Sequence, residues 1–448
     1  MENTALQAIS PIDGRYHSKS KELASYFSEE ALFRYRVKVE VEYFIALASL
    51  PIPAFKKLSA KQLTALRSLY SGFNANDASR IKEIEKVTNH DVKAVEYFIK
   101  EKLTAPTFRE AKEFVHFALT SQDVNNTATP LMIKDCINEV YLPLMQTLLS
   151  KLKELAKTWK DIPMLARTHG QPASPTKLGK EIAVFIERIE QQLMLMKGIP
   201  HAAKFGGATG NFNAHYAAYP NINWIKFADG FVNKILGLKR SKTTTQIEHY
   251  DHMAAMFDNL KRINNILMDL DRDLWAYISL NYFKQKIKKG EVGSSAMPHK
   301  VNPIDFENSE GNLGIANALF EHFSSKLPIS RLQRDLTDST VLRNVGVPMA
   351  HTVIAVKSLL TGLEKIYVHE EAIRNDLEAN WAVVSEAVQT ILKAEGIEGA
   401  YEKLKDFSRT GGGITKKEME SFIDSLSVTP ALKARLKKIS PHNYTGRN

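Results

Sequence analysis

The sequence predicts an all-α fold built around a bundle of long helices, and two observations lead to this prediction. Apolar residues recur at steps of three and four along three segments of the chain, while alternating strand patterns joined by Asn-Gly or Asp-Gly turns are absent. The composition is that of an ordinary soluble globular protein, with 44% hydrophobic and 25% charged residues. A chain of 448 residues buries a sizeable core without disulfides.

The three periodic segments are each long enough to form a helix of about five turns. An apolar stripe with this period is the face that a helix buries against its neighbours, so we expect a helical bundle that other subunits can complete. The stripes consist of Leu144, Leu148, Leu152, Leu155 and Trp159, then of Leu178, Ile182, Phe185, Ile189, Leu193 and Met196, and finally of Phe257, Leu260, Ile263, Leu267, Leu270 and Leu274.

Shifts in composition divide the chain into three predicted domains. Residues 1–115 carry shorter helical patterns and several prolines, which predicts an N-terminal helical domain. Residues 116–366 hold the long periodic segments and form the predicted central bundle. Residues 367–448 contain a run of three glycines between short helical patterns, which predicts a small C-terminal helical domain.

Charge and cysteine content restrict the partners and the compartment. The net charge is +10 and the pI is about 9.2, but the basic residues are spread along the chain, which favours an anionic small substrate over nucleic acid. The single cysteine, Cys136, cannot form an internal disulfide and fits a reducing compartment. There is no secretory signal pattern and no uninterrupted apolar stretch of membrane-spanning length, so we expect a cytoplasmic protein with no membrane partner.

The stretch most informative about chemistry is Gly-Ser-Ser-Ala-Met-Pro-His-Lys-Val-Asn-Pro, residues 293–303. Its two prolines disfavour helix in the residues before them, so the stretch is a predicted loop. Hydroxyl groups, the cation of Lys300 and the amide of Asn302 suit a carboxylate substrate, with a serine in proton transfer. Taken alone, the loop is equally compatible with a turn that has no chemical role.

This loop resembles the signature loop of the fumarase/aspartase superfamily, and its continuation is similar to that of the bacterial adenylosuccinate lyase family. The resemblance extends in order from residue 10 to about residue 445. It implies a three-domain all-α fold, with a central long-helix bundle that forms a core of about 20 helices in a homotetramer. It also implies active sites shared among three subunits. The other matching segments are SPIDGRY at 10–16, TNHDVKAVEY at 88–97, RTHGQP at 167–172 and RDLTDS at 334–339.

The resemblance further implies a lyase that needs no cofactor and no metal. It would eliminate fumarate from adenylosuccinate to give AMP, and from the succinyl-carboxamide ribotide SAICAR to give AICAR. The nearest alternative is another lyase of the superfamily, of the argininosuccinate lyase or fumarase type, which should lack the Arg15-Tyr16 pair and the trio at 89–91. A non-catalytic helical scaffold is the more distant alternative, because it would not need His169 or Ser294.

Catalytic roles follow from the same resemblance. His169 would be the general acid that protonates the departing purine nitrogen, a role suited to a group that titrates near neutrality. Ser294 would be the general base, with Ser295 as the rival, and its alkoxide would need stabilisation by nearby dipoles. Lys300 and Asn302 would stabilise the carbanion as its doubly charged aci-carboxylate.

Substrate contacts are implied at further positions. Thr120 and Ser121 have the pattern of a helix N-cap, where an anion can bind, and Asn89 or Asp91 could cap the helix that follows them. Arginine suits phosphate or carboxylate because its planar fork pairs with two oxygens. The implied substrate-binding set is Arg15, Tyr16, Asn89, His90, Asp91, Thr120, Ser121, Thr168, Gln246, Lys300, Asn302, Asn308, Arg334, Ser339 and Arg343.

Two other segments give weaker patterns. The glycine-rich run at 205–211 has no strand pattern before it, so it is not a predicted nucleotide-binding motif, and its glycines are expected to let the backbone pass near the site. His249 and His252 lack further ligands for zinc. Tyr250 occupies a position where bacterial relatives often carry histidine, so no contact is assigned to that stretch.

Overall fold

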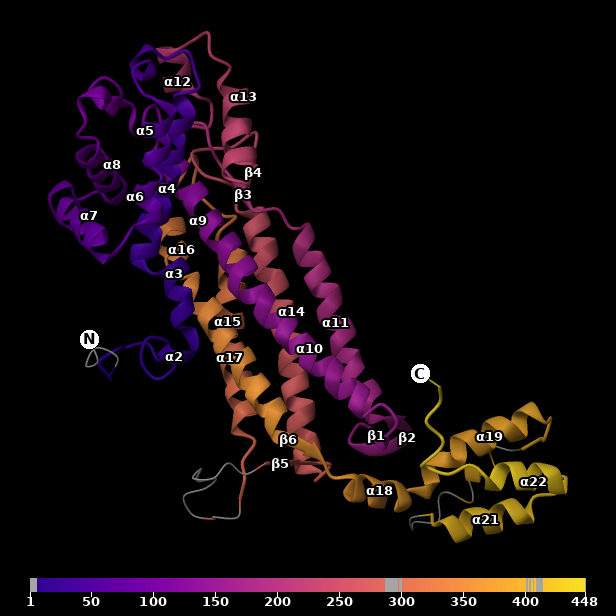
Figure 1. Cartoon of the computed structure of the whole chain (residues 1–448). Coiled ribbons are helices and arrows are strands. Elements are labelled where there is room, and N and C mark those ends of the chain that lie inside the picture. Colours follow the sequence, from indigo (N-terminus) through magenta and orange to yellow (C-terminus); the bar gives the residue numbers. More distant parts are fainter. Residues whose placement is uncertain are drawn as a thin grey trace. The chain divides into compact units, whose positions relative to one another are not determined.

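The computed structural model describes residues 6–286, 297, 300–399, 402, 404, 405, 407 and 414–447. Helices dominate these residues, which confirms the predicted all-α class (Figure 1). The three periodic segments correspond to the first three of five long helices. These five are α10 (Leu142–Thr158), α11 (Leu178–Gly198), α14 (Asp251–Ser279), α15 (Ile304–Lys326) and α17 (Gly346–Lys365).

Other helices and short strands make up the rest of the described regular structure. The strands pair as β1 (Pro163–Thr168) with β2 (Gln171–Lys177), β3 (Ala202–Ala203) with β4 (Lys239–Arg240), and β5 (Phe283–Gln285) with β6 (Ile366–Val368). The other α-helices, of which α4 is also long, are α2 (His17–Ser20), α3 (Ala24–Phe27), α4 (Glu29–Leu47), α5 (Ala60–Ala65), α6 (Ser68–Ser71), α7 (Ala75–Thr88), α8 (Asp91–Lys102), α9 (Ser121–Cys136), α12 (Asn213–Ala218), α13 (Trp224–Asp229), α16 (Thr337–Leu342), α18 (Glu370–Glu378), α19 (Ser385–Ala394), α21 (Lys416–Ser425) and α22 (Pro430–Lys437).

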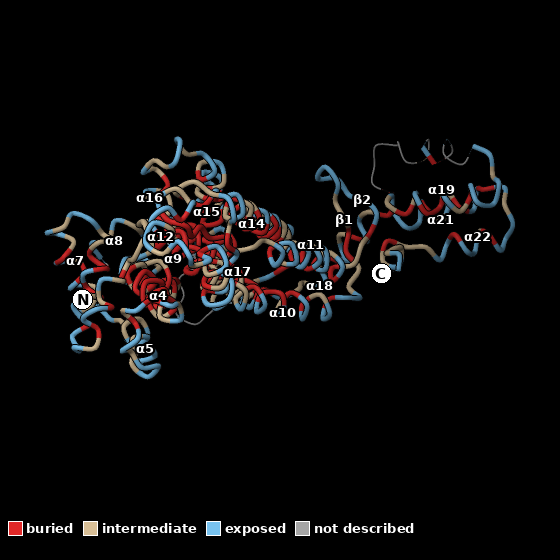
Figure 2. The backbone as a smooth tube through the Cα atoms, turned by 90° about the horizontal axis from the view of Figure 1, so that it is seen from above, coloured by how far each residue is buried: buried red, intermediate tan, exposed pale blue. Residues whose placement is uncertain are grey.

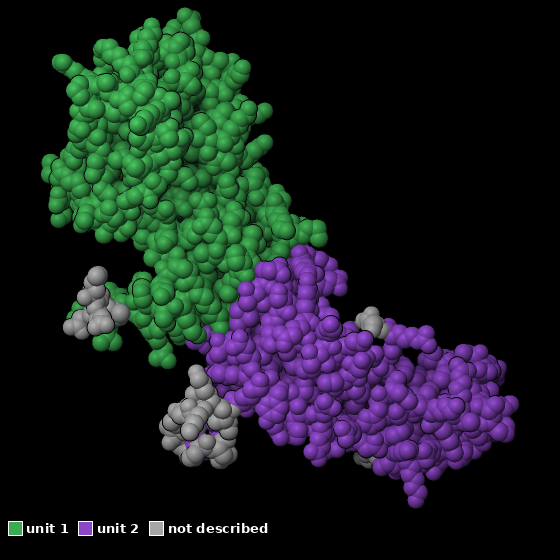
Figure 3. All heavy atoms as spheres, viewed as in Figure 1, with its two compact units in different colours: residues 1–145, 192–265, 311–357 green, residues 146–191, 266–310, 358–448 purple. Residues whose placement is uncertain are grey.

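The chain forms two compact units, each assembled from three separate stretches (Figure 3). All five long helices contribute residues to both units. Unit 1 contains residues 1–145, 192–265 and 311–357, and unit 2 contains residues 146–191, 266–310 and 358–448. The three-domain division at residues 115 and 366 stays a prediction.

The core of unit 1 centres on α4. Phe33, Val37, Val41 and Phe44 recur along this helix at the helical period and are buried (Figure 2). Burying each such side chain contributes about 1.5 to 3 kcal/mol. Because α4 also packs against α7, α8 and α9, the core fixes the ends of those helices that carry predicted site residues.

The C-terminal part of unit 2 has a separate small core. Trp381, Val388, Met419 and Leu436 belong to one buried cluster on the facing sides of the short helices there. The apolar faces of α19 and α21 therefore pack against each other and against α22 in this part of the chain.

One helical stretch among the described residues, Thr337–Lys365, is long and apolar enough to cross a membrane by length and composition alone. However, 72% of its most apolar window is buried inside the protein. Val353, Ile354 and Leu359 are all fully buried there. The apolar character of this stretch is thus accounted for by packing in the helical core.

Candidate active site

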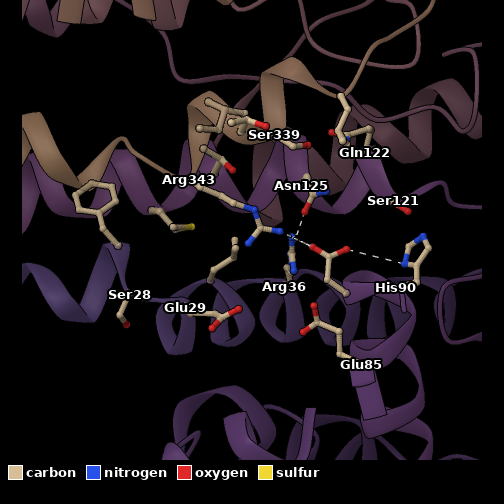
Figure 4. Close-up of a pocket in the computed structure, with 18 of the residues that line it drawn as sticks. Ser28, Glu29, Arg36, Glu85, His90, Ser121, Gln122, Asn125, Ser339 and Arg343 are labelled. Carbon is tan, nitrogen blue, oxygen red and sulfur yellow. Dashed lines mark hydrogen bonds and ion pairs between the residues drawn. The ribbon is translucent and has the colours of Figure 1, made fainter. Parts of the chain in front are cut away.

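A cavity of about 530 Å³ lies in unit 1. Its walls come from α4, the junction of α7 and α8, the first turns of α9 and the segment 334–346. These segments are distant in sequence, and all of them except α4 carry residues that were predicted from the sequence to bind substrate (Figure 4). The predicted residues that line the cavity are Asn89, His90, Asp91, Ser121, Arg334, Ser339 and Arg343.

The junction of α7 and α8 places three of them. Asn89 ends α7 in the left-handed conformation, with a φ of 50°, which asparagine tolerates better than most residues. His90 is the N-cap of α8, because its Nδ1 accepts a hydrogen bond from the backbone N–H of Lys93 at 3.1 Å. The prediction that Asn89 or Asp91 caps this helix was therefore wrong. Asp91 is instead the first helical residue, and its carboxylate faces the cavity.

Two arginines converge on Asp91. Its Oδ2 accepts from Nη2 of Arg36 at 2.8 Å and from Nη2 of Arg343 at 3.0 Å, and Figure 4 shows both guanidinium groups at the cavity. Burial would raise the pKa of Asp91, but Arg36, the backbone N–H of Val92 and Arg343 together hold it below its usual value. Asp91 is therefore an anion, and it neutralises part of the positive charge in the cavity.

Asp123, which is buried and does not line the cavity, fixes the N-terminus of α9. Its Oδ2 accepts from the backbone N–H of Thr120 at 2.9 Å, and its Oδ1 accepts from those of Gly206 at 2.8 Å and Gly207 at 3.1 Å. Lys204 pairs with the same carboxylate at 2.8 Å, and both side chains are completely buried. The glycine-rich run thus supports α9, whose first residue, Ser121, lines the cavity. A helix N-terminus in this position favours an anionic ligand.

The segment from Arg334 to Arg343 supplies the opposite wall. Nη2 of Arg334 donates to Oγ of Ser339 at 2.8 Å. The amide oxygen of Gln122, when turned toward Arg334, accepts from its Nε and Nη2 at 3.2 and 2.8 Å. This wall therefore presents two guanidinium groups and a hydroxyl, donors that suit phosphate or carboxylate oxygens.

Tyr250 has a structural position next to this wall. It is 1% exposed, and its hydroxyl donates to Oδ2 of Asp338 at 2.9 Å. The hydroxyl oxygen of Tyr250 in turn accepts from Nδ2 of Asn126 at 2.8 Å. These bonds link α9 to α16. Tyr250 therefore has a structural role, because its buried hydroxyl connects the two helices.

His169 lies at the tip of a β-hairpin in unit 2. Thr168 pairs with Gln171, so His169 and Gly170 are the two turn residues, with φ values of 54° and 74°. A two-residue turn with both φ values positive is the type I′ hairpin turn. The left-handed conformation costs a non-glycine residue roughly 1 to 2 kcal/mol, and such strain is concentrated at functional sites.

His169 is exposed on this turn, and the two strands on either side of it were not predicted from the sequence. Prolines at 163, 172 and 175 hide the alternation expected of a strand. The pairing register also shifts between Leu165 and Arg167, which is a bulge. Strand pairing here is set by contacts that a linear pattern does not reveal.

The remaining predicted residues lie outside the cavity lining. Gln246 is in unit 1 and donates from Nε2 to the carbonyl of Ala208 at 3.2 Å, next to the glycine-rich run. Arg15 is exposed and Tyr16 half-buried at the start of α2, and Thr120 is half-buried. Thr168, Lys300, Asn302 and Asn308 belong to unit 2, where Oδ1 of Asn308 accepts from Oγ of Ser358 at 2.8 Å. Ser294 and Ser295 are outside the described residues.

Among the residues that the structure describes, no group of three or more His, Cys, Asp or Glu side chains is arranged to hold a metal ion. His249 and His252 thus form no such centre with described neighbours.

Comparison with known proteins assigns the family. Residues 14–317 match a family described as lyase, and residues 330–445 match one described as adenylosuccinate lyase C-terminal. An adenylosuccinate lyase of Dictyostelium discoideum is 57% identical to this chain, covering 98% of it and 97% of its own length. The chain belongs to the adenylosuccinate lyase family. Adenylosuccinate lyases of Vibrio cholerae and Escherichia coli K12 are each 49% identical, covering the whole chain and 98% of their own length.

Solved structures agree on the fold of this adenylosuccinate lyase family member. A 3-carboxy-cis,cis-muconate lactonizing enzyme from Pseudomonas putida superposes with a TM-score of 0.74 at 20% identity, covering 95% of this chain and 94% of its own. A β-carboxy-cis,cis-muconate cycloisomerase from Acinetobacter calcoaceticus gives a TM-score of 0.71 at 18% identity, covering 95% of each chain. The resemblance to the fumarase/aspartase superfamily, drawn from the sequence, is confirmed.

Several residues of the site were missed from the sequence. Arg36, Gln122 and Asn125 line the cavity, and Asp123 and Lys204 support it. The Thr-x-x-Asp spacing of residues 120–123 is a capping-box pattern and was the one signal available. The carboxylates that pair with Arg36 and Lys204 are 55 and 81 positions away, so no local sequence pattern predicts these two ion pairs.

Proposed function

We propose that this chain eliminates fumarate from adenylosuccinate to give AMP, and from SAICAR to give AICAR. The observation that carries the proposal is the cavity of unit 1, where Arg334, Ser339 and Arg343 lie opposite the N-terminus of α9. A substrate with a phosphate at one end and two carboxylates at the other matches donors placed on both walls. The family membership supports the same reaction.

Binding is assigned to the residues of unit 1. Arg334, Ser339 and Arg343 hold the phosphate, while Ser121 and the first turn of α9 receive a carboxylate of the succinyl group. Asp91 and His90 contact the polar part of the substrate between them. Arg15, Tyr16, Asn89, Thr120 and Gln246 complete this set in unit 1, and Thr168 and Asn308 add contacts from unit 2.

The chemistry is general acid and base catalysis. Ser294 removes a proton from the carbon next to the one that bears the leaving nitrogen, and the electron pair forms the double bond of fumarate as the carbon–nitrogen bond breaks. His169 donates a proton to the departing nitrogen. Lys300 and Asn302 stabilise the dianion that develops on the adjacent carboxylate, where positive charge and amide donors act most strongly. One proton leaves carbon and one reaches nitrogen, so no electron acceptor is required.

The working enzyme is proposed to be a cytoplasmic homotetramer whose sites are shared among three subunits. The cavity belongs to unit 1, whereas His169 and Lys300 belong to unit 2. Large apolar residues remain exposed on three of the long helices, including Met194 at 68%, Trp275 at 46% and Ile315 at 51%. Apolar exposure on long helices supports their burial against other subunits.

The test is the ultraviolet spectrum of the purified protein with adenylosuccinate, because removal of the succinyl group alters the purine chromophore. We expect a steady spectral change, and a parallel change with SAICAR. Argininosuccinate is the comparison substrate. Release of fumarate from argininosuccinate, with no change in adenylosuccinate, would assign the chain to the alternative lyase type.

The base is tested by comparing Ser294→Ala with Ser295→Ala. We expect Ser294→Ala to bind substrate with little loss but to stall before the carbon–nitrogen bond breaks, while Ser295→Ala has a milder effect. Solvent deuterium exchange at the substrate carbon separates the two, provided that the wild type shows exchange. Loss of exchange in Ser295→Ala alone would transfer the role to Ser295.

A further inference from the structure

A carboxylate on α18 holds the strand that leads to His169. Oδ2 of Asp376 accepts from Nη2 of Arg167 at 2.6 Å, and the hydroxyl of Tyr282 donates to the same oxygen. Nδ2 of Asn380 donates to the other oxygen, Oδ1, at 3.2 Å. All of these residues belong to unit 2. Asp376 therefore connects the hairpin of β1 and β2 to α18 and to the segment that precedes β5.

Arg167 is well placed to transmit this contact. It lies two residues before His169, immediately after the bulge in β1. A bulge re-aims the side chains that follow it, and here the guanidinium group is directed to α18. Nε of Arg167 is buried and has no hydrogen-bond partner among the described residues, so Asp376 is the chief anchor of this side chain.

The other side of the contact is rigid. Tyr282 is 2% exposed, and its ring stacks on that of Tyr277 with 6.2 Å between the centroids. Its carbonyl accepts from the backbone N–H of His369 at 2.8 Å, where β5 pairs with β6 just before α18. Burial and the neighbouring carboxylate raise the pKa of Tyr282, so its hydroxyl remains a hydrogen-bond donor at neutral pH.

We infer that Asp376 is a positioning residue for the general acid, acting on His169 through Arg167. The inference rests on the proposed function, because it takes His169 as the proton donor. The turn is exposed, and His169 adopts a left-handed conformation that costs a non-glycine residue energy. The orientation of the turn is therefore set by β1 and β2, the two strands that it joins. Anchoring Arg167 fixes the end of β1 and with it the direction in which His169 presents its ring.

A contact that acts only on the proton donor affects turnover more than binding. We expect Asp376→Asn to lower kcat about ten- to a hundredfold with KM within about twofold of the wild type, because a small misplacement of a catalytic group has a large effect on rate. Asp376→Glu keeps the carboxylate and should recover part of the loss. The matched control is Asp269→Asn, whose carboxylate pairs with Arg188 at the same distance of 2.6 Å in the same unit, and it should leave kcat unchanged.

A double-mutant cycle tests whether the effect passes through His169. In a His169→Ala background, Asp376→Asn should change turnover by less than about twofold, because the group that it positions is gone. An equal loss in both backgrounds, a raised KM with unchanged kcat, or a kcat equal to that of the control would overturn the inference. If Asp376→Asn does not fold, Arg167→Met is measured in its place, with the same expectations.

Hydrogen–deuterium exchange of residues 163–177 gives a readout that does not depend on the substrate. The hairpin should exchange faster in Asp376→Asn than in the wild type or in Asp269→Asn, because its anchor is lost. Unchanged exchange would also overturn the inference. Failure of the wild type to convert adenylosuccinate would instead remove the proposed function, and the exchange measurement would still decide whether Asp376 holds the hairpin.

Discussion

The cavity of unit 1 and the hairpin of unit 2 differ in how their candidate functional residues are held and in how far they are exposed. The charges that support the cavity are paired before any ligand arrives: the buried Arg36 and the exposed Arg343 both contact the half-buried Asp91, and Asp123 forms a fully buried ion pair with Lys204. His169 is exposed on a two-residue turn, and the nearest ion pair that holds its strand is that of Arg167. In our proposal, binding therefore rests on buried supports in unit 1, whereas the proton donor, His169, is carried on an exposed turn.

This difference has a physical basis. Groups that bind an anion must keep their charge and position, and burial among partners provides both at the cost of desolvation. A general acid must exchange protons with solvent in each cycle, which favours exposure. We therefore expect variants of the cavity supports to affect stability and binding, and variants of the hairpin to affect turnover.

The largest expected effect is that of Lys204→Met on stability. Removing the cation leaves the fully buried Asp123 carboxylate unpaired, and breaking a buried ion pair from one side costs about 3 to 5 kcal/mol. Thermal melting should show a large loss of stability. The double variant Lys204→Met with Asp123→Asn should lose less than the sum of the two single variants. Additive losses would mean that the pair does not act as a unit.

His169→Ala should be nearly silent in stability and severe in turnover. We expect a fall in kcat of about 10² or more, with the assembly intact and substrate still bound, because only the transition state loses an interaction. Steady-state kinetics and equilibrium binding separate the two effects. Near-normal turnover of the pure variant would remove His169 as the acid and would remove the contrast between the two regions.

Arg36→Met tests the electrostatics of the cavity. Arg36 is the strongest of the groups that lower the pKa of Asp91, so its loss should raise that pKa. A carboxyl whose pKa is lowered by folding stabilises the folded protein at pH values above its pKa in the unfolded chain. This stabilisation is lost as the pH falls through its pKa in the folded protein. The acid limb of kcat/KM should therefore move to higher pH, with an increase in KM. Arg34→Met, on the same helix but bonded to the carbonyl of Ser25, should leave the limb in place.

The smallest expected effect concerns an acid in unit 2 that has no cationic partner among the described residues. Asp271 on α14 is 1% exposed, and burial raises its pKa well above the usual value, with Glu310 adding to the shift and Ser309 opposing it. A raised carboxyl pKa contributes stability at low pH that is lost as pH rises. Asp271→Asn should therefore raise the melting temperature by a few degrees at pH 8 and by less at pH 5. The exposed neighbour Asp269→Asn should show no such trend.

Sequence reasoning predicted the helices of the bundle because their period is visible in one dimension. The stripes from Leu144 to Leu274 correspond to α10, α11 and α14. It also predicted seven residues that the cavity brings together, although their positions came from a family resemblance and not from spacing.

The parts that were missed depend on long-range pairing. The hairpin that carries His169 contains three prolines and a bulge, so its strands lack the usual alternation. Arg36 and Lys204 are buried cations whose ion-pair partners, Asp91 and Asp123, are distant in sequence. Nothing near either cation in the sequence distinguishes it from an exposed one.

The most direct test of the account is complementation between the two regions. His169→Ala disables the hairpin, and Arg343→Ala disables the cavity. Each variant alone should be inactive. After subunit exchange between equal amounts of the two, random mixing should restore roughly a quarter of the wild-type sites if the cavity and the hairpin of one site come from different subunits. Mass spectrometry of the intact assemblies would first demonstrate that subunits have exchanged. A mixture that then stays inactive would mean that His169 and Arg343 of one site belong to the same chain, which would contradict the account.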